Sequence, residues 1–550
     1  MFLRTVTVKN HQYVQLAHNH RDPETGVSKT QVLYNFGRSE QVDLPAVRRL
    51  IKSLSKLLSA DEQAAICQKL EGDFAFKFLG SRQLGGCQLL DGLWHRLKID
   101  QVLKRLLADR DYRTPIERLI FAMVANRALA PSSKLGIEAW VGQDVCIDEL
   151  AEVDVHQLYR AMDFLLEASA QIQHEVFFAV ANLFNLEVDL IFLDTMTTYF
   201  EIEGEDPDGL RKRGYSKDNH PELAQVVIAF AVTRSGIPVR MWVWPGNTSD
   251  QDIVAQVKQD LNDWNLGRVV MVQDTGFNSE SNRRILQGAG GHYIIGEKLR
   301  LGSKGAPAEA LSRGGKYQKL PNGLECKEVI VGGDSEARRR FVIVRNPEEA
   351  ERDRKKREDI LAEVARRLEE LHQLADQPHQ KAACELRSHE VFGRYIRQTK
   401  TGKLCLNHAK IQMEENFDGK YLLSTSDDGL SVADVVMGYK QLFEIERVFR
   451  DLKHLLDIRP VYHRLPERIK SHVLLCWLAM LLIRIAENET DLTWRQMKRM
   501  LVTVQLGMHQ TQVGEVWQTN PLSAEVTEIF KQLNVKTPPK YYALKLLEQL

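Results

Sequence analysis

The stretch from 186 to 300 alternates short apolar runs with helical patterns, and this alternation restricts the fold more than any other feature of the sequence. The apolar runs are β-rich and bounded by polar residues, so they are expected to be buried strands. The expected order is a strand at 189–194, strands at 224–233 and 238–244, a helix from about Asp250 to Trp264, a strand at 268–273, a helix near 278–288 and a strand at 292–295. This alternation predicts an α/β domain.

Three strands, a helix, a strand, a helix and a strand is the order of a ribonuclease-H-like fold. A return strand is expected at Tyr421–Thr425, after an interruption that is rich in glycine and charged residues. Within the interruption, strand-like pieces lie at Glu328–Val331 and Arg340–Val344, and a long charged helix is expected from about Pro347 to Ala375. The predicted fold is a ribonuclease-H-like core interrupted by a β-rich insertion.

The flanking regions are predicted from their own patterns. The N-terminal segment carries two expected strands, Tyr13–Leu16 and Gln31–Phe36, followed by a basic helix at roughly Pro45 to Leu58. Asp154 and Gln157 form the capping box of a helix in a mostly helical region. The predicted domains are a small N-terminal β/α unit at 1–75, a helical region at 80–185, the core at 186–300 and 420–485, the insertion at 300–420 and a C-terminal helical region at 485–550.

Three acidic residues stand out by their positions. Asp194 closes the apolar run 190–193 and Asp274 closes the run 269–273, so each is placed at the end of an expected strand. Taken alone, such an aspartate is commonly a solvated strand end or a helix cap. Glu446 lies far downstream on a helical stretch. Carboxylates at two strand ends and on one helix are able to share two divalent cations, which clamp the attacking and leaving oxygens of a phosphoryl displacement.

The helix around Glu446 has an apolar face and a charged border. At roughly 100° per residue, its apolar face comprises Leu442, Ile445, Val448, Phe449 and Leu452. On the border, within about 60° of one another by the same helical spacing, lie Tyr439, Glu446, Arg450 and Lys453. This stripe is compatible with a salt-bridged structural face, and equally with a metal ligand beside a row of phosphate-binding residues.

The spacing of Tyr439, Glu446 and Lys453 resembles the tyrosine–arginine–glutamate–lysine signature of bacterial insertion-sequence transposases of the DDE class. The signature arginine is replaced by Leu442, with Arg447 and Arg450 close by. The resemblance spans about 190–300 and 420–485. It also includes the segments Phe192–Thr195, Val272–Phe277 and the Gly-Asn turn Pro245–Asp250.

The resemblance implies an enzyme that cuts DNA at the ends of an insertion sequence and joins the freed 3′ hydroxyl to target DNA. It assigns catalysis and metal binding to Asp194, Asp274 and Glu446, with Mg²⁺ as the cofactor and Mn²⁺ able to substitute. It assigns DNA contacts to Tyr439, Arg447, Arg450 and Lys453. The implied partners are double-stranded DNA, as element ends and as target, and a second copy of the chain in a homodimer on paired ends.

The resemblance also bears on the other domains. The helical region at 80–185 is expected to bind DNA ends, and the insertion is expected to help hold the cut end. If the insertion stacks on a flipped base, the candidate aromatic residues are Tyr317, Phe341, Phe392 and Tyr395. Two alternatives remain: a related nuclease that only hydrolyses DNA, and a DNA-binding relative without catalytic activity.

The net charge is zero, so any DNA affinity has to come from local basic patches. Such patches lie at Arg211–Arg213, at Arg338–Arg340, at Arg394, Arg397, Lys400 and Lys403, and at Arg464, Arg468 and Lys470. Each patch is equally compatible with an ordinary solvated surface.

The remaining sequence signals narrow the setting. Seven cysteines show no CxxC or Cys/His spacing, which argues against a zinc site or a disulfide framework. Gly291–Lys298 lacks the Gly-Lys-Ser/Thr ending of a phosphate-binding loop, so no nucleotide is expected. The N-terminus lacks the apolar core of a signal peptide, and Val473–Ile483 is too short to span a bilayer. A cytoplasmic protein without membrane partners is expected, associated with the nucleoid when bound to DNA.

Overall fold

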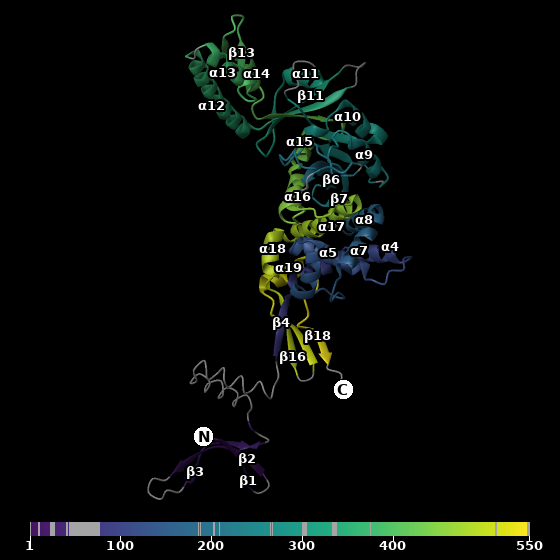
Figure 1. Cartoon of the computed structure of the whole chain (residues 1–550), viewed down its shortest axis with the longest axis vertical. Helices are drawn as coiled ribbons and strands as arrows, with labels where there is room; N and C mark the ends of the chain where they lie inside the picture. Colours follow the sequence, from purple (N-terminus) through teal and green to yellow (C-terminus); the bar gives the residue numbers. More distant parts are fainter. Residues whose placement is uncertain are drawn as a thin grey trace. The chain divides into compact units, whose positions relative to one another are not determined.

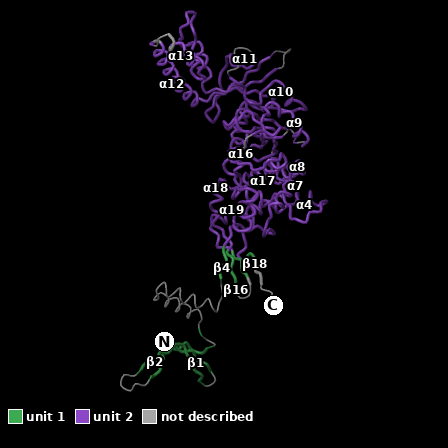
Figure 2. Tube along the Cα trace, viewed as in Figure 1, with its two compact units in different colours: residues 1–80, 507–518, 541–550 green, residues 81–506, 519–540 purple. Residues whose placement is uncertain are grey.

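The computed structural model describes residues 2–8, 11–21, 28–39, 42, 77–184, 186, 189–201, 204–207, 209–264, 266, 268–299, 305–332, 338–373, 376–511 and 514–546. The chain divides into two compact units (Figure 2). Unit 1 comprises residues 1–80, 507–518 and 541–550, and unit 2 comprises residues 81–506 and 519–540.

A nine-stranded sheet forms the centre of unit 2, with the strand order β10-β11-β12-β15-β9-β8-β5-β6-β7. Its strands β6, β7 and β11 are labelled in Figure 1. The strands are β5 (Leu190–Tyr199), β6 (Gln225–Val232), β7 (Pro238–Pro245), β8 (Val270–Gln273), β9 (His292–Glu297), β10 (Gln318–Lys319), β11 (Glu325–Val331), β12 (Arg339–Arg345) and β15 (Lys420–Thr425).

The half of the sheet from β7 to β9 has the strand and helix order that the sequence predicted. β5, β6 and β7 are antiparallel neighbours, whereas β8 runs parallel to β5 and β9 runs parallel to β8. Parallel neighbours need crossover connections, and here α9 (Val254–Asn262) joins β7 to β8 while α10 (Glu280–Gln287) joins β8 to β9. The result is a mixed α/β unit with a ribonuclease-H-like order.

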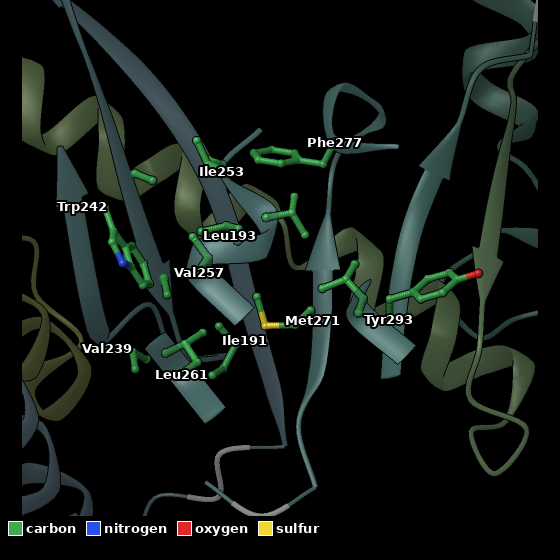
Figure 3. Close-up of a cluster of buried hydrophobic side chains, with 14 of the residues drawn as sticks. Ile191, Leu193, Val239, Trp242, Ile253, Val257, Leu261, Met271, Phe277 and Tyr293 are labelled. Atoms are coloured by element: carbon green, nitrogen blue, oxygen red, sulfur yellow. The ribbon is translucent and has the colours of Figure 1, made fainter. Parts of the chain in front are cut away.

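The main core of this half lies between the sheet and helices α9 and α10 (Figure 3). Ile191 and Leu193 of β5 and Met271 of β8 pack with Val257 and Leu261 of α9. All five side chains are buried. A fully buried aliphatic side chain contributes roughly 1.5–3 kcal/mol, so this packing fixes the ends of β5 and β8 relative to each other.

β5 is longer than predicted, so Asp194 lies in the middle of the strand and not at its end. The parallel pairing with β8 stops at Leu193 and Gln273. The antiparallel pairing with β6 continues, however, until Tyr199 lies opposite Gln225. The hydrogen bonds of β6 therefore carry β5 beyond Asp194, which the apolar pattern of β5 alone did not reveal.

The insertion is only partly the β-rich body that the sequence predicted. Its strands β10, β11 and β12 extend the central sheet, because β12 pairs with β15 from Arg340–Thr425 to Arg345–Lys420. The rest of the insertion forms a separate hydrophobic cluster around the buried stripe Val364, Leu368 and Leu371. Its elements are α12 (Pro347–His372), α13 (Asp376–Ser388), β13 (Ile396–Gln398), β14 (Leu404–Leu406) and α14 (His408–Glu415).

The region at 80–185 is helical, as predicted. Its helices are α3 (Gly85–Arg96), α4 (Ile99–Leu107), α5 (Ile116–Leu129), α6 (Lys134–Ala139), α7 (Val155–Glu167) and α8 (Ser169–Phe184). Asp154 and Gln157 form the predicted capping box of α7. α5 and α7 pack against α17 (Pro466–Thr490) (Figure 1). α17 is long and apolar enough to cross a membrane, but 94% of its apolar window is buried inside the protein.

The C-terminal region differs from the predicted helical layer. Its described residues contain the end of α17, the helices α18 (Trp494–Leu501) and α19 (Ala524–Gln532), and the strands β16 (Gln505–Thr511), β17 (Gly514–Thr519) and β18 (Tyr541–Leu546). These strands and β4 (Lys77–Gln83) form a four-stranded sheet in the order β18-β17-β16-β4. β17 pairs with β16 and β18 inside this region, and β16 also pairs with β4, a segment distant in the sequence, which a prediction from 485–550 alone misses.

The N-terminal part of unit 1 is an antiparallel three-stranded sheet. Both predicted strands are present as β2 (His11–Arg21) and β3 (Ser28–Arg38), and β1 (Phe2–Val8) was not predicted. The expected helix at 45–58 lies outside the described residues.

Candidate active site

The parallel register of β5 and β8 brings Asp194 and Asp274 side by side, at the point where the pairing of these two strands ends. Leu193 lies opposite Gln273, so each aspartate is the next residue on its chain. Asp274 follows β8 directly and is exposed, whereas the Asp194 side chain is only 20% exposed. The backbone amide of Thr195 donates a 2.7 Å hydrogen bond to Asp194 Oδ1, which fixes the orientation of this carboxylate.

Glu446 lies on a helix that is shorter than predicted. The sequence placed Tyr439 and Lys453 on one helix, but this helix is interrupted at Gln441 and Leu442, which separate α15 (Val432–Lys440) from α16 (Phe443–His454). Gln441 and Leu442 are not helix breakers, so the interruption is not visible in the sequence. Glu446 is exposed in the first turn of α16.

Tyr439, at the end of α15, connects the helical side of the site to the sheet. Its hydroxyl donates a hydrogen bond of 3.1 Å to Asp274 Oδ1. Burial raises the pKa of Tyr439 well above its ordinary value, and the charges of Asp274 and Glu446 raise it further. The hydroxyl therefore keeps its proton and remains a donor. A Cβ atom at Gly296 would lie 2.4 Å from this hydroxyl, so only glycine fits at that point of β9.

Asp250 is a fourth carboxylate in the site that the sequence reasoning did not assign. Its Oδ1 accepts a hydrogen bond from Thr195 Oγ1, and a Cβ at Gly276 would lie 3.2 Å from its Oδ2. Burial raises the pKa of Asp194 to about 6, and the charges of Asp250 and Asp274 contribute to that rise. Asp250 closes the Gly-Asn turn noted in the sequence, but nothing in that turn indicates where its carboxylate points.

Lys217 supplies the positive charge among these carboxylates. Its ammonium lies 3.6 Å from Asp194 Oδ1 and 3.3 Å from Asp250 Oδ2, and it donates a 2.8 Å hydrogen bond to the Thr195 carbonyl oxygen. The charge of Lys217 partly offsets the rise in the pKa of Asp194. Lys217 lies between β5 and β6, in a segment without a recognisable motif, so sequence reasoning had no signal for it.

The next residue, Asp218, binds the positively charged side chains of Lys453 and Arg459. Lys453 Nζ donates a 2.8 Å hydrogen bond to Asp218 Oδ1, and Arg459 Nη1 donates one of 2.9 Å to Asp218 Oδ2. Lys453, a predicted DNA contact, is therefore connected to Asp194 and Asp250 by the adjacent residues Asp218, which binds Lys453, and Lys217, which pairs with the two acids.

The two predicted arginine contacts differ in their surroundings. Arg450 is exposed on α16. Arg447 donates a hydrogen bond of 2.9 Å to Glu487 Oε2 on α17, and the buried Arg484 binds the same carboxylate oxygen at 2.9 Å. The charge of Arg447 is thus already balanced within the protein.

The chemistry of the carboxylates suits a hard divalent cation, because Mg²⁺ is bound through oxygen ligands. Asp250 and Asp274 lie close enough to Asp194 for their negative charges to raise its pKa, and a bound cation would relieve this repulsion. Among the described residues, no group of three or more His, Cys, Asp and Glu side chains is already arranged to hold a metal ion. The carboxylates therefore fit such an ion by chemistry, provided that Lys217 gives way and the side chains adjust.

A ribonuclease-H-like sheet with adjacent aspartates where the pairing of two parallel strands ends, and cationic side chains beside them, defines a class of enzymes that process nucleic acids. Two family comparisons place the chain within that class. The transposase DDE domain matches residues 199–482, more than half of the chain, and the N-terminal domain of IS1634 family transposases matches residues 3–65. The chain belongs to the DDE transposase family and is an insertion-sequence transposase. The DDE match includes Asp274 and Glu446 and begins five residues after Asp194.

Solved transposase structures show only distant likeness. The piggyBac transposase synaptic complex with hairpin DNA has a TM-score of 0.34 and 10% identity, over 77% of this chain and 82% of that chain. The Mos1 transposase paired-end complex with the left transposon end has a TM-score of 0.13 and 14% identity, over 36% of this chain and 57% of that chain. Both scores are too low to establish a shared arrangement. No curated protein matches the chain.

Proposed function

We propose that this transposase cuts DNA at the ends of its insertion sequence and joins the freed 3′ hydroxyl to target DNA by two-metal phosphoryl transfer. The observation that carries the proposal is that Asp194 and Asp274 lie side by side, with Tyr439 joined to Asp274. The spacing of Tyr439, Glu446 and Lys453 supports membership of the subgroup with the tyrosine–arginine–glutamate–lysine signature.

Asp194, Asp274 and Glu446 are the proposed metal ligands, and Asp250 is close enough to assist them. Bound Mg²⁺, or Mn²⁺ in its place, would stabilise the charge that develops on the scissile phosphate. It would also favour ionisation of the water that cuts the element end and of the freed 3′ hydroxyl that attacks target DNA.

The chain's own residues perform the positioning. The Tyr439 hydroxyl holds the Asp274 carboxylate in place through its hydrogen bond. Arg450 is exposed and free to contact a DNA phosphate, whereas Lys453 has to exchange Asp218 for a phosphate oxygen. Arg447 was included among the predicted contacts, but its bond to Glu487 supports a structural role.

The other domains have proposed roles in holding DNA. The N-terminal unit (1–75) and the helical region (80–185) would recognise the element ends, and the insertion (300–420) would hold the cut end beside the core (186–300 and 420–485). The region at 485–550 would support the core. Phe341 and Tyr395 are 0% and 5% exposed, so base stacking would fall to Tyr317 or Phe392. Cutting two ends together implies a homodimer on DNA.

A magnesium-dependent strand-transfer assay tests this function. The donor is the DNA that flanks the gene, the target is a supercoiled plasmid, and the wild type is compared with Asp194→Ala and Glu446→Ala. A matched control is Glu525→Ala, an exposed glutamate in the first turn of α19. We expect cut and joined products from the wild type and the control, and neither from the two site variants, while end binding stays intact.

Other outcomes separate the alternatives. Cutting without joining would replace the proposal with a nuclease, and end binding without cutting in the wild type would replace it with a non-catalytic DNA-binding protein. Products that persist in Glu446→Ala would remove Glu446 from the ligand set.

A further inference from the structure

A cavity of about 440 Å³ lies between α10 and the start of β12, and five arginines line it. Arg283 and Arg284 come from α10, and Arg338, Arg339 and Arg340 come from the beginning of β12. Two acidic residues, Glu280 and Asp428, share the lining, so the wall carries a clear excess of positive charge.

This cavity is distinct from the acidic site. It is lined by Tyr293 at the beginning of β9 and Thr425 at the end of β15. The acidic site meets β9 at Gly296, against which the Tyr439 hydroxyl lies. Tyr293 and Gly296 are three residues apart, roughly 10 Å along a strand, and successive side chains of a strand point to opposite faces. Tyr293 packs in the core on the α10 side, so the two sites are on opposite faces of one strand.

Three of the arginines have protein partners. Arg339 pairs with Glu297 at 2.6 Å, Arg340 pairs with Glu328 at 2.5 Å, and Arg284 pairs with Glu280. Arg283 donates to the side-chain oxygen of Asn278, which carries no charge, and no acidic partner of Arg338 lies among the described residues. No ion pair balances Arg283 or Arg338 among the described residues, and since Glu280 pairs with Arg284, at most Asp428 of the two acidic residues in the wall offsets these two charges.

The paired arginines also retain donor capacity. The Nε atom of Arg339 is buried without a hydrogen-bond partner in the described structure. Burial lowers the pKa of Arg339, and the charge of Arg283 lowers it further although Glu297 opposes this. Two like charges and an unsatisfied buried donor at one cavity are unfavourable for the protein alone. An anion with several oxygen acceptors would satisfy both.

We propose that this arginine cavity binds a phosphate group of a DNA strand. A guanidinium donates two parallel hydrogen bonds to phosphate oxygens, which makes arginine the preferred residue for such groups. The Ser426 hydroxyl in the wall accepts a hydrogen bond from the Tyr293 amide and keeps its own proton for a phosphate oxygen, whereas the Thr425 hydroxyl already donates to the Tyr293 carbonyl oxygen. This proposal rests on the proposed function because it takes the phosphate group to belong to DNA. The cavity would hold DNA without reading its sequence, because phosphate contacts carry no base information.

The test measures DNA binding by the full chain without Mg²⁺, so that no cutting is needed. Fluorescence anisotropy with a duplex carrying the element end is recorded at several salt concentrations for the wild type and Arg283→Ala/Arg338→Ala. Each lost phosphate contact reduces the slope of log K against log salt by about 0.9 for duplex DNA. We expect the slope to fall by about 1–2 and the affinity at low salt to fall several-fold.

The matched control is Arg234→Ala/Lys531→Ala, which removes the same charge from ion-paired positions outside the regions proposed to hold DNA: Arg234 pairs with Asp189, and Lys531 pairs with Glu528. An unchanged slope in this control together with a reduced slope in the cavity variant supports the proposal. Equal slopes in the wild type and cavity variant, or equal losses in both double variants, overturn it. The variant Arg283→Lys/Arg338→Lys retains both charges and serves as a control for misfolding. A salt slope close to that of the wild type in this variant supports a local effect of the two charges.

Inorganic phosphate distinguishes a free anion from the DNA backbone. If millimolar phosphate raises the Tm of the wild type but not of Arg283→Ala/Arg338→Ala, and the DNA salt slopes are equal, the cavity is a free-anion site and the DNA proposal is wrong. The binding slope does not depend on Glu446, so loss of the proposed catalytic function and loss of this site are seen in different measurements.

Discussion

Replacing Lys217 by methionine is expected to strengthen the binding of divalent metal ions to the free protein. In the structure the Lys217 ammonium lies 3.6 Å from Asp194 and 3.3 Å from Asp250, where a cation would bind. Any ion entering the site has to displace this ammonium or share the carboxylates with it. Methionine keeps the length and most of the volume of the lysine stem but removes the charge.

The size of the effect follows from the two ion pairs. At about 3.5 Å and an effective dielectric constant near 20, each pair interacts by about 4–5 kcal/mol before solvation is considered. Measured pairs that remain partly exposed retain only about 0.5–1 kcal/mol each. Losing both ion pairs of Lys217 therefore makes the free energy of metal binding more favourable by about 1–2 kcal/mol, which corresponds to a Kd roughly 5- to 30-fold lower.

The assay is titration calorimetry with Mn²⁺ in the absence of DNA, checked by the electron paramagnetic resonance signal of free Mn²⁺. A pH near 8 keeps Asp194 ionised, because its pKa is about 6 and removal of Lys217 raises it further. The control is Lys212→Met, whose Nζ donates to the Pro207 carbonyl oxygen away from the acids. An affinity that is unchanged or weaker in Lys217→Met, while Lys212→Met equals the wild type, would refute the idea that Lys217 competes with the metal.

Two further predictions concern other parts of the molecule. Tyr439→Phe removes the 3.1 Å hydrogen bond to Asp274. The rate of strand cutting should fall by roughly 5- to 30-fold, the equivalent of about 1–2 kcal/mol, while end binding stays unchanged. A cutting rate equal to that of the wild type would show that Tyr439 does not position Asp274. Lys134→Met should raise the free energy of unfolding by about 1–3 kcal/mol at pH 6.5 in urea titrations, because burial and then Arg127 lower the pKa of Lys134 from 10.5 to about 7. Between pH 7 and pH 10.5 Lys134 is protonated in the unfolded state but neutral in the folded state. The destabilisation of the fold by Lys134 is therefore complete below pH 7 and disappears toward pH 10.5. The gain should shrink over the same window, and the exposed Lys531→Met should show no such gain.

The order of strands and helices in the core could be predicted because each strand buries both faces and reads as a continuous apolar run. The same runs placed Asp194 and Asp274 on neighbouring strands. Their local pattern did not reveal that β6 extends β5 beyond Asp194, because that extension depends on hydrogen bonds to another strand.

The missed parts of the site have a common cause. Lys217, Asp218 and Asp250 lie in connections between elements, where no periodicity fixes the direction of a side chain. Tertiary packing brings them to the carboxylates, as it brings Arg447 to Glu487. The C-terminal strands were missed because they are stabilised by pairing with one another and, for β16, with the distant β4, which no local pattern indicates.

The Lys217–Asp218 dipeptide has a consequence for the order in which ligands arrive. Lys217 pairs with Asp194 and Asp250, which a metal ion would need as ligands. Asp218 pairs with Lys453 and Arg459. A metal ion has to move the first residue and a DNA phosphate has to take Lys453 from the second. We expect displacement of one residue to favour displacement of the other, because they share a peptide bond. Metal and DNA binding would then be linked, and such linkage is reciprocal: each ligand would lower the free-energy cost of admitting the other.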